Sequence, residues 1–348
     1  MKTIILHHPQ AQATSTPVHI GEGMLIELHQ FIEKLGNFDG FFILHDAAVK
    51  TVAKDIASHL QKAHLISVPS GEASKSLHEV ERIASSLLAL GATRQSLLLN
   101  VGGGMLTDLG GFVASMYMRG IGCVHIPTTL LGMVDASIGG KTGVDLGTVK
   151  NLLGAFHHPR AVIADIRLLS TLPDTQFCEG LVEVIKIAAM LDANFLEYIE
   201  KNMKKILAKE SSVLLSCIEK AVSLKVQIVE EDERDQTKRL FLNFGHTIGH
   251  AVEAVSDFTI SHGKAVSIGM IAEMQLADLK GVDRMKHLLE EINMPTVIPD
   301  TCKPQTLLRA MQSDKKVISR DLRIAVPREF GKGEIITLDE ERFLRTYS

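Results

Sequence analysis

Unbroken apolar runs in the first half of the chain end in glycine or small polar residues. Phe41-Phe42-Ile43-Leu44 is followed by His45-Asp46, and Leu97-Leu98-Leu99-Asn100-Val101 is followed by three glycines. Similar runs occur at 64–68, 123–126 and 161–165. Because these runs lack polar alternation and helical patterns follow them, they predict strands of a parallel sheet with helices on both faces. Such sheets bind ligands beyond the carboxyl ends of their strands, so we expect a ligand there.

The pattern changes at Leu172-Pro173, after which apolar residues recur at helical spacing. We expect helices at 174–191, 193–208, 212–230, 243–255, 263–280, 283–292 and 304–313, and a short hairpin near 322–337. The sequence therefore predicts an α/β protein with two domains. Residues 1–172 would form a Rossmann-like, parallel-sheet nucleotide domain, and residues 173–348 an otherwise all-helical domain.

The composition is that of an ordinary globular protein. Of the 348 residues, 45% are hydrophobic and 22% are charged, and the formal net charge of −4 argues against binding to nucleic acid. The four cysteines have no Cys-x-x-Cys spacing, which favours a reducing cytoplasm. The segment 1–9 has too short an apolar run for a signal peptide, and no apolar stretch reaches the ~18 residues of a membrane span. We expect a cytoplasmic enzyme with no membrane contact and no further domain after Ser348.

The segment Gly102-Gly103-Gly104-Met105-Leu106-Thr107-Asp108 has features of a phosphate-binding turn. Glycines allow the backbone to approach a pyrophosphate closely and to present N–H groups at a helix N-terminus. The segment does not match Gly-x-Gly-x-x-Gly, because position 107 is threonine, and it does not match a Walker A loop. The glycines could serve chain geometry alone, but small polar residues at four other strand ends favour a dinucleotide.

A second glycine-rich segment, at 135–145, carries Lys141 directly after two glycines. An ammonium group beside exposed backbone donors suits a phosphate, whereas the alternative is a solvated surface loop. The apolar flanks favour anion binding. Further cations stand in or beside these segments and predict a multiply charged anionic ligand: Arg119, Lys150, Lys186, Lys225, Arg239, Lys315 and Lys316.

Histidines and a carboxylate in the second half have the spacing of a metal site. His246 and His250 are four residues apart, so on a helix they project from one face, and His262 follows after a short interval. Glu183 and Lys186 lie three apart on a largely apolar helix, where charged groups indicate an inward-facing wet site more than a surface ion pair. Each histidine alone is more often a core residue. Two or three imidazoles and one carboxylate leave a coordination position open, which predicts a catalytic zinc-type site.

Over nearly its whole length the chain resembles the 3-dehydroquinate synthases, a family of sugar phosphate cyclases. The matching segments are Gly71-Glu72 with Lys75, Gly102 to Asp108, Tyr117 to Gly120, Pro127 to Leu131, Asp135 to Val144, Lys150-Asn151, Gly180 to Lys186, Arg239 to His250, and His262-Gly263. The resemblance implies an NAD-binding α/β domain, a helical metal-binding domain and a homodimer. It implies that the seven-carbon sugar phosphate DAHP (3-deoxy-D-arabino-heptulosonate 7-phosphate) becomes 3-dehydroquinate and phosphate in the shikimate pathway. The steps would be transient oxidation by NAD, phosphate elimination, re-reduction, ring opening and aldol closure.

The resemblance also implies roles for individual residues. Glu183, His246 and His262 would bind one divalent ion, zinc or cobalt. The implied catalytic and substrate-binding residues are Asp135, Lys141, Asn151, Lys186, Lys225, Arg239, Asn243 and His250, with Arg119 reaching across a dimer and one of Lys315 and Lys316 in the anion clamp. The implied NAD contacts are Asp46, Ser70, Gly71, Glu72, Lys75, Gly104, Met105, Leu106, Thr107, Asp108, Thr128, Thr129, Lys141, Lys150, Leu168, Leu169, Ser170 and Thr171. Asp145 and Lys264, where the family usually has Asn and Glu, stand beside the substrate region.

Three alternatives stay open on the sequence. They are another sugar phosphate cyclase, a metal-dependent alcohol or glycerol dehydrogenase that releases NADH, and a binding protein on an inactive enzyme fold. A dehydrogenase needs no phosphate clamp, and the residues that count against it are Lys141, Asn151, Arg119 and Arg239. The complete set of metal ligands counts against a protein without activity.

Overall fold

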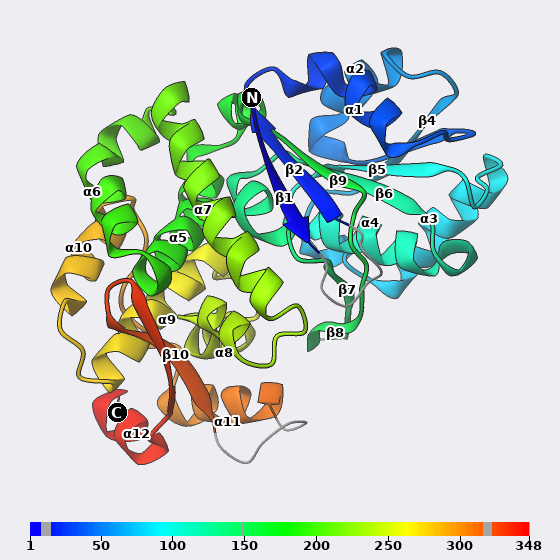
Figure 1. Ribbon diagram of the computed structural model, residues 1–348. Helices are drawn as coiled ribbons and strands as arrows, with labels where there is room; N and C mark the ends of the chain where they lie inside the picture. Colours follow the sequence, from blue (N-terminus) through cyan, green and yellow to red (C-terminus); the bar gives the residue numbers. More distant parts are fainter. Residues whose placement is uncertain (8–14, 148, 316–321, 348) are drawn as a thin grey trace. The chain divides into compact units, whose positions relative to one another are not determined.

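The computed structural model describes residues 1–7, 15–147, 149–315 and 322–347 (Figure 1). The chain forms two compact units: unit 1 comprises 1–173 and 214–230, and unit 2 comprises 174–213 and 231–348. The segment 214–230 thus clusters with the amino-terminal half, although the predicted domain boundary places it in the second half. Which ligand each predicted domain binds stays a prediction.

A seven-stranded sheet with the order β1-β2-β9-β6-β5-β3-β4 forms the centre of unit 1. All neighbouring strands run parallel except β1, which pairs antiparallel with β2 at one edge. The strands are β1 (Lys2–His7), β2 (Ser15–Gly21), β3 (Phe41–Asp46), β4 (Ala63–Val68), β5 (Leu97–Gly102), β6 (Gly122–Pro127) and β9 (Ala161–Asp165). The five expected strands are confirmed. Strands β1 and β2 were not predicted, because their apolar runs are short and broken by polar residues.

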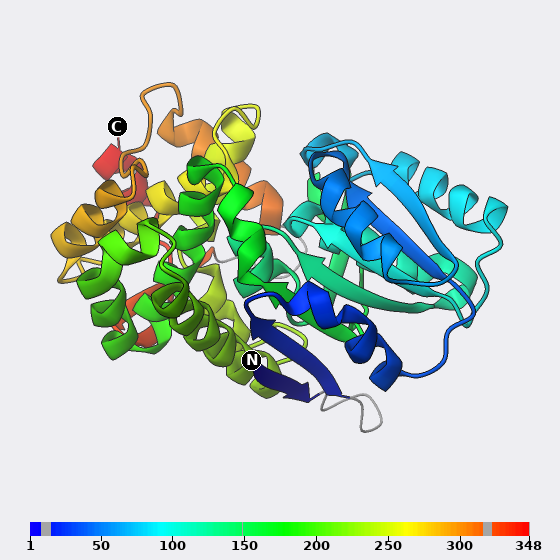
Figure 2. The same ribbon diagram turned by 90° about the horizontal axis from the view of Figure 1, so that it is seen from above.

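Helices cover both faces of this sheet (Figure 2). Leu44 packs among residues of α3 and α4, whereas the preceding Ile43 packs among residues of α1 and α2 on the opposite face. Because successive side chains of a strand alternate between two buried faces, the strands carry apolar runs without polar alternation. The helices are α1 (Leu28–Leu35), α2 (Lys50–Ser58), α3 (Leu77–Ala89) and α4 (Gly104–Met116).

Several short elements of unit 1 connect its strands and helices. They are the 3-10 helices η1 (Met24–Glu27), η2 (Ala47–Val49), η3 (Glu72–Ser74), η4 (Tyr117–Arg119) and η6 (Ile166–Thr171), and the π-helical turn η5 (Gly132–Ala136). An antiparallel hairpin of β7 (Lys141–Leu146) and β8 (Val149–Phe156) was not predicted from the sequence. Helix α7 (Ser211–Glu231) supplies the segment of unit 1 that comes later in the chain.

Unit 2 is mainly helical. Its elements are α5 (Asp174–Leu191), α6 (Ala193–Leu207), η7 (Lys238–Asn243), α8 (His246–Val255), α9 (His262–Leu276), α10 (Val282–Glu291), α11 (Pro304–Lys315), the hairpin β10 (Arg323–Glu329) and β11 (Lys332–Thr337), and α12 (Glu340–Tyr347). The expected helices and hairpin are confirmed, with shifted ends. A helix was expected from 243, but α8 begins at His246, because Gly245 has a φ of 78° and interrupts the helix. Ile248, Ala265 and Phe343 belong to the buried core of this unit.

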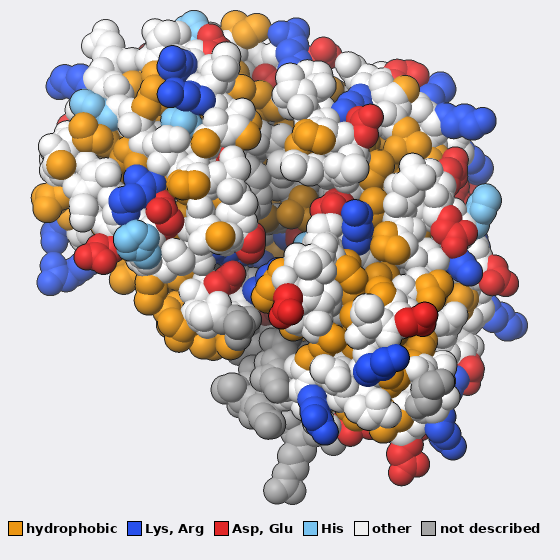
Figure 3. All heavy atoms as spheres, turned by 180° about the vertical axis from the view of Figure 1, so that it is seen from behind, with side chains coloured by type: hydrophobic (Ala, Val, Ile, Leu, Met, Phe, Trp, Pro, Cys, Tyr) orange, Lys and Arg blue, Asp and Glu red, His pale blue; other side chains and the backbone are white. Residues whose placement is uncertain are grey.

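Charged side chains of both signs are interspersed over the face shown in Figure 3. This mixture agrees with a formal net charge close to neutrality for a chain of this length. Within the described ranges, we find no helix that is both long and apolar enough to cross a bilayer.

Candidate functional site

The predicted metal ligands gather in unit 2. Glu183 lies on α5, whereas His246 and His262 are the first residues of α8 and α9. One ligand atom from each residue lies within 4.8 Å of the other two. Oε1 of Glu183 is 3.8 Å from Nε2 of His246 and 3.6 Å from Nε2 of His262. This arrangement can hold a divalent ion between one buried carboxylate and two imidazoles.

Close packing of α8 against α9 brings the histidines together. A Cβ atom at Gly249 would lie 2.9 Å from the carbonyl oxygen of Ala265, and one at Gly245 would lie 2.7 Å from that of Val266. Gly245 also has the left-handed φ that glycine adopts without a steric penalty. Gly245 and Gly249 are therefore required for the close approach of the two helices, and Gly245 is also required for its left-handed backbone conformation.

A buried carboxylate anchors the start of α8. Glu273 on α9 accepts hydrogen bonds from the backbone N–H groups of Gly245 (2.7 Å) and Ile248 (3.2 Å). These N–H groups belong to the first turn of a helix, where no intrahelical acceptor is present and negative charge is favoured. Glu273 thus holds the turn that carries His246 against α9.

Both ligand imidazoles have an acceptor at Nδ1. Nδ1 of His246 lies 3.1 Å from the carbonyl oxygen of Phe244, and Nδ1 of His262 lies 3.4 Å from Oε2 of Glu253. With Nδ1–H donated to these acceptors, the Nε2 lone pair of each ring is directed toward Glu183. Neither oxygen of the buried Glu183 carboxylate accepts a hydrogen bond of regular geometry.

The charges of this cluster shift the pKa of each ligand. Burial raises the pKa of Glu183, but the Lys186 ammonium and the two imidazoles outweigh burial and hold that pKa well below its usual range. Burial, followed by the Lys186 ammonium, lowers the pKa of His246 to about 3. Burial lowers the pKa of His262, but the Glu183 and Glu253 carboxylates outweigh it and raise this pKa to about 10. Without an ion, the site therefore combines a carboxylate, a neutral imidazole and an imidazolium.

Further predicted residues lie in unit 2. The Lys186 ammonium is buried and forms an ion pair with Glu183. The His250 ring centroid is 5.3 Å from that of His246 and 6.0 Å from that of His262. Arg239 and Asn243 lie in η7, which contacts α5, and the Arg239 guanidinium donates a hydrogen bond to the carbonyl oxygen of Glu233 at 2.8 Å. Lys315 ends α11, and Lys316 lies outside the described residues.

In unit 1 the glycine-rich turn connects β5 to the N-terminus of α4. Gly104, Met105, Leu106, Thr107 and Asp108 form the first turns of this helix. A Cβ atom at Gly103 would lie 3.0 Å from Cγ2 of Thr129, and the Thr128 N–H donates to the carbonyl oxygen of Gly102 at 2.9 Å. The predicted residues at the ends of β5 and β6 therefore lie side by side at the carboxyl edge of the sheet.

A buried ion pair lies beside this turn. The Lys75 ammonium donates to Oδ2 of Asp108 at 2.7 Å and lies 3.7 Å from Oε1 of Glu72. Burial lowers the pKa of Lys75, but the Asp108 and Glu72 carboxylates outweigh it and raise this pKa. Gly71 has a φ of 103°, which glycine tolerates at the turn before Lys75. These residues hold the segment after β4 against α4.

Other predicted NAD contacts lie at neighbouring strand ends. Asp46 ends β3 and accepts a hydrogen bond from the Ala48 N–H at 2.8 Å, and the Ser70 hydroxyl donates to the Asp46 carboxylate. Leu168, Leu169, Ser170 and Thr171 lie in η6, directly after β9. β3, β4, β5, β6 and β9 all contribute residues to the same edge of the sheet.

A second group of predicted residues joins η5, α7 and the β7–β8 hairpin. The Lys225 ammonium on α7 donates to the carbonyl oxygen of Asp135 at 2.5 Å and pairs with the Asp135 carboxylate. Lys141 begins β7, and Lys150 and Asn151 lie on β8. Arg119 ends η4 with a φ of 67°.

Asp145 has a structural role that sequence reasoning missed. Its carboxylate accepts a hydrogen bond from the Asn151 N–H at 2.7 Å, and its own N–H donates to the carbonyl oxygen of Lys75 at 2.9 Å. Asn151 has a φ of 53°, so Asp145 also holds a left-handed residue. Asp145 therefore ties the hairpin to the segment that carries Lys75.

Two buried glutamates near the metal ligands were also missed. Glu253 and Glu273 are 2% and 0% exposed, and each contacts a group that positions a predicted ligand. A signal was present, because each is a carboxylate on a mostly apolar helix, and Glu253 is seven residues after His246 on one helical face.

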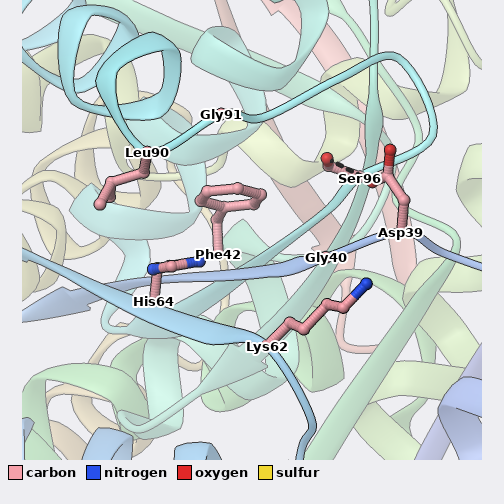
Figure 4. A pocket seen from close by; sticks show the side chains of 8 residues that line it. All are labelled: Asp39, Gly40, Phe42, Lys62, His64, Leu90, Gly91 and Ser96. Atoms are coloured by element: carbon pink, nitrogen blue, oxygen red, sulfur yellow. Dashed lines mark hydrogen bonds between the residues drawn. The ribbon is translucent and has the colours of Figure 1, made fainter.

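A cavity of about 220 Å³ lies elsewhere in unit 1 (Figure 4). It is lined by Asp39, Gly40, Phe42, Lys62, His64, Leu90, Gly91 and Ser96. Phe42 and His64 stand near the amino ends of β3 and β4, so this cavity is at the opposite end of these strands from the predicted NAD contacts.

The chain matches two known sequence families. Residues 65–179 match the family described as 3-dehydroquinate synthase N-terminal, and residues 180–317 match 3-dehydroquinate synthase C-terminal. The chain is 39% identical over 337 residues to the 3-dehydroquinate synthase of Dictyoglomus turgidum, covering 94% of this chain and 92% of the relative.

Solved structures of related cyclases have the same fold. A 2-deoxy-scyllo-inosose synthase, solved with carbaglucose-6-phosphate, NAD+ and Co2+, is 26% identical with a TM-score of 0.90 over 99% of both chains. The 2-epi-5-epi-valiolone synthase of Streptomyces hygroscopicus, solved with NAD+ and Zn2+, is 25% identical with a TM-score of 0.88 over 97% of this chain and 96% of that chain. From the two family matches and the identity over nearly its full length, the chain belongs to the 3-dehydroquinate synthase family.

Proposed function

We propose that this chain converts DAHP into 3-dehydroquinate and inorganic phosphate, and acts as an NAD- and metal-dependent carbon–oxygen lyase. The observation that carries the proposal is the cluster of Glu183, His246 and His262 in a member of this family. The relative named 3-dehydroquinate synthase is 39% identical, whereas the cyclases named for other products are 25–26% identical. This difference favours DAHP over the substrates of other cyclases.

The residues of unit 2 fit one divalent ion. Glu183 offers buried oxygens without regular hydrogen bonds, and the acceptors at Nδ1 of His246 and His262 leave both Nε2 atoms for coordination. Nitrogen and oxygen ligands suit either zinc or cobalt. A bound ion would polarise the hydroxyl group to be oxidised, and NAD would supply reversible hydride transfer.

The residues of unit 1 fit NAD. The N-terminus of α4 follows β5 directly and presents backbone N–H groups, which favour a pyrophosphate. The carboxylate of Asp46 ends β3 and is a hydrogen-bond acceptor of the kind that a ribose hydroxyl requires. We therefore assign the cofactor to the carboxyl edge of the sheet, with the predicted contacts given above.

The remaining predicted residues are proposed to balance charge, to transfer protons and to bind the anionic groups of the substrate. Lys186 balances the charge of Glu183, and the His250 imidazole stands close enough to both ligand histidines to exchange a proton with a substrate hydroxyl at the ion. In unit 1, the Lys225 ammonium pairs with the Asp135 carboxylate, which can accept a hydrogen bond from a substrate hydroxyl. Lys141, Asn151, Arg239 and Asn243 form the proposed clamp for the phosphate and carboxylate groups.

We also propose a cytoplasmic homodimer. Leu146, Val149 and Leu152 on the β7–β8 hairpin are 45–54% exposed, as are Met116 (56%) and Met118 (38%) beside Arg119. Exposed apolar side chains of this size favour a protein contact, and a second copy of the chain is the simplest partner. The four free, buried cysteines suit a reducing compartment.

A panel of phosphorylated sugars tests the substrate assignment. The purified protein, with NAD and Co2+, is incubated separately with DAHP, glucose 6-phosphate and sedoheptulose 7-phosphate, and phosphate release is measured. We expect release from DAHP to be fastest by orders of magnitude, and a Glu183→Gln variant to release none. Faster release from either other sugar would assign the chain to another cyclase reaction.

A further inference from the structure

Glu253 is a buried carboxylate that contacts the proposed metal ligand His262 on the side of the ring opposite Glu183. It lies on α8, two helical turns after His246, and its side chain is 2% exposed. Its Oε2 atom is 3.4 Å from Nδ1 of His262. The opposite nitrogen of the same ring, Nε2, is 3.6 Å from Oε1 of Glu183. The His262 imidazole therefore lies between two carboxylates that belong to different helices.

Glu253 suits the tautomer of His262 that a bound ion requires. An ion at Nε2 takes the lone pair on the side of Glu183, so the neutral ring keeps its proton at Nδ1, where the Glu253 carboxylate accepts it. The His262 side chain is 33% exposed, and His262 is the first residue of α9. A hydrogen-bond acceptor at Nδ1 therefore restricts the rotation of the His262 ring, which packing alone does not fix.

His246 provides an internal comparison. Its Nδ1 donates to the carbonyl oxygen of Phe244, a backbone group two residues earlier in the chain. The more exposed His262 instead depends on a side chain from α8. The backbone acceptor of His246 is neutral and remains when the side chain of Phe244 is substituted. The carboxylate acceptor of His262 adds negative charge, and substitution of Glu253 removes it.

We propose that Glu253 is a positioning residue for the metal site, which orients His262 and strengthens its Nε2 as a ligand. The inference rests on the proposed function, because it requires an ion held by Glu183, His246 and His262. An outer carboxylate that accepts the second N–H of a ligating histidine commonly changes metal affinity by roughly 10–100-fold.

A competing arrangement predicts a different stoichiometry. One ligand atom each from His250, Glu253 and His262 also lies within 4.8 Å of the others. If Glu253 were itself a ligand, these residues would hold a second ion beside the first. The positioning role predicts one ion per chain in the wild type and in every variant of Glu253.

The test uses three variants of the full-length protein. Glu253→Gln retains an oxygen that can accept from Nδ1 but removes the charge, and Glu253→Met fills a similar volume without an acceptor. Ser261→Ala is the matched control, because the Ser261 hydroxyl donates to Glu179 at 2.6 Å next to His262 without contacting its imidazole. Co2+ affinity and stoichiometry are measured by competition with a chromophoric chelator, and the melting temperature is measured without the ion.

We expect Co2+ affinity to fall by ~10–100-fold in Glu253→Met and by less in Glu253→Gln, and to stay at the wild-type value in Ser261→Ala. The visible absorption bands of bound Co2+ should shift in Glu253→Met, and each protein should bind one ion. Wild-type affinity and spectrum in Glu253→Met would overturn the inference, as would two ions in the wild type and one in the variant. A fall in affinity that follows a lower ion-free melting temperature in both Glu253 variants would also overturn it. A wild-type protein that binds no Co2+ would overturn the proposed metal site and this inference together.

Discussion

Gly269 on α9 faces the backbone of Gly245 so closely that a Cβ atom at 269 would lie 1.9 Å from the Gly245 carbonyl oxygen. Gly245 immediately precedes His246, so this contact sets the distance between the helix that carries His246 and the helix that carries His262. The position of the metal ligands thus depends on a backbone approach that only glycine permits.

Gly269→Ala should therefore destabilise unit 2 and weaken ion binding. Alanine is favoured over glycine within a helix by about 1 kcal/mol. Overpacking of a close contact costs about 1–3 kcal/mol, and this contact is with backbone that cannot rotate away. We expect a lower free energy of unfolding in urea and a weaker affinity for Co2+. Equal or greater stability with wild-type affinity would show that the helices can separate without consequence.

His246→Ala should remove the ion, because two ligands cannot replace three in a site with an open position. We expect less than one-tenth of the wild-type ion content by elemental analysis, and no phosphate release from DAHP. Chelator treatment of the wild type should have the same effect and should be reversed by Co2+ or Zn2+. Full activity in the ion-free wild type would contradict the proposed role of the cluster.

Lys141→Ala should raise the KM for DAHP and slow the release of phosphate, because it removes a cation from the proposed clamp. An ion pair to a phosphate contributes about 1.5–3 kcal/mol, which corresponds to at least a tenfold loss in kcat/KM. Lys62→Ala is the control, because Lys62 is an exposed lysine directly before β4, at the amino edge of the seven-stranded sheet. Similar kinetics for both variants would show that Lys141 lies outside the clamp.

Unit 1 should lose stability as the pH falls, through His125. Burial, with a smaller effect of His157, lowers the pKa of His125 from 6.5 to about 3, and the Asn100 amide contacts its Nδ1 at 3.1 Å. Below pH 6.5 the unfolded chain binds a proton at His125, whereas the folded protein binds one only near pH 3. The free energy of unfolding is therefore highest above pH 6.5 and falls as the pH is lowered. Between pH 7 and pH 5 we expect a loss of about 2 kcal/mol from this group. Urea titrations of the wild type and His125→Gln at both pH values measure it, and equal losses in both proteins would contradict the assignment.

Much of the fold follows from local patterns in the sequence. The buried strands β3, β5 and β9 carry apolar runs that both covered faces of the sheet require, and α5 begins directly after Pro173 as its composition indicates. The β7–β8 hairpin was missed, because its glycines and polar residues show no strand pattern. Its position depends on long-range contacts such as the hydrogen bond from the Asp145 N–H to Lys75.

The candidate site was only partly predictable for a similar reason. Spacing along the chain already grouped His246, His250 and His262 and indicated an inward-facing Glu183, and the resemblance to the family selected Glu183, His246 and His262 as the ligands. The partners that orient these ligands, Glu253 and Glu273, act across the α8–α9 contact, and sequence spacing does not reveal which side chains meet there. Tertiary packing supplied that information.

The ratio of phosphate to NADH tests the central claim most directly. The protein is loaded with Co2+ and incubated with DAHP in excess over a small amount of NAD, and phosphate, 3-dehydroquinate and NADH are measured together. Because the hydride is returned to the substrate, we predict one phosphate and one 3-dehydroquinate for each DAHP consumed, many turnovers for each NAD, and no net NADH. NADH formed in step with substrate consumption, without phosphate, would identify a dehydrogenase and contradict this account.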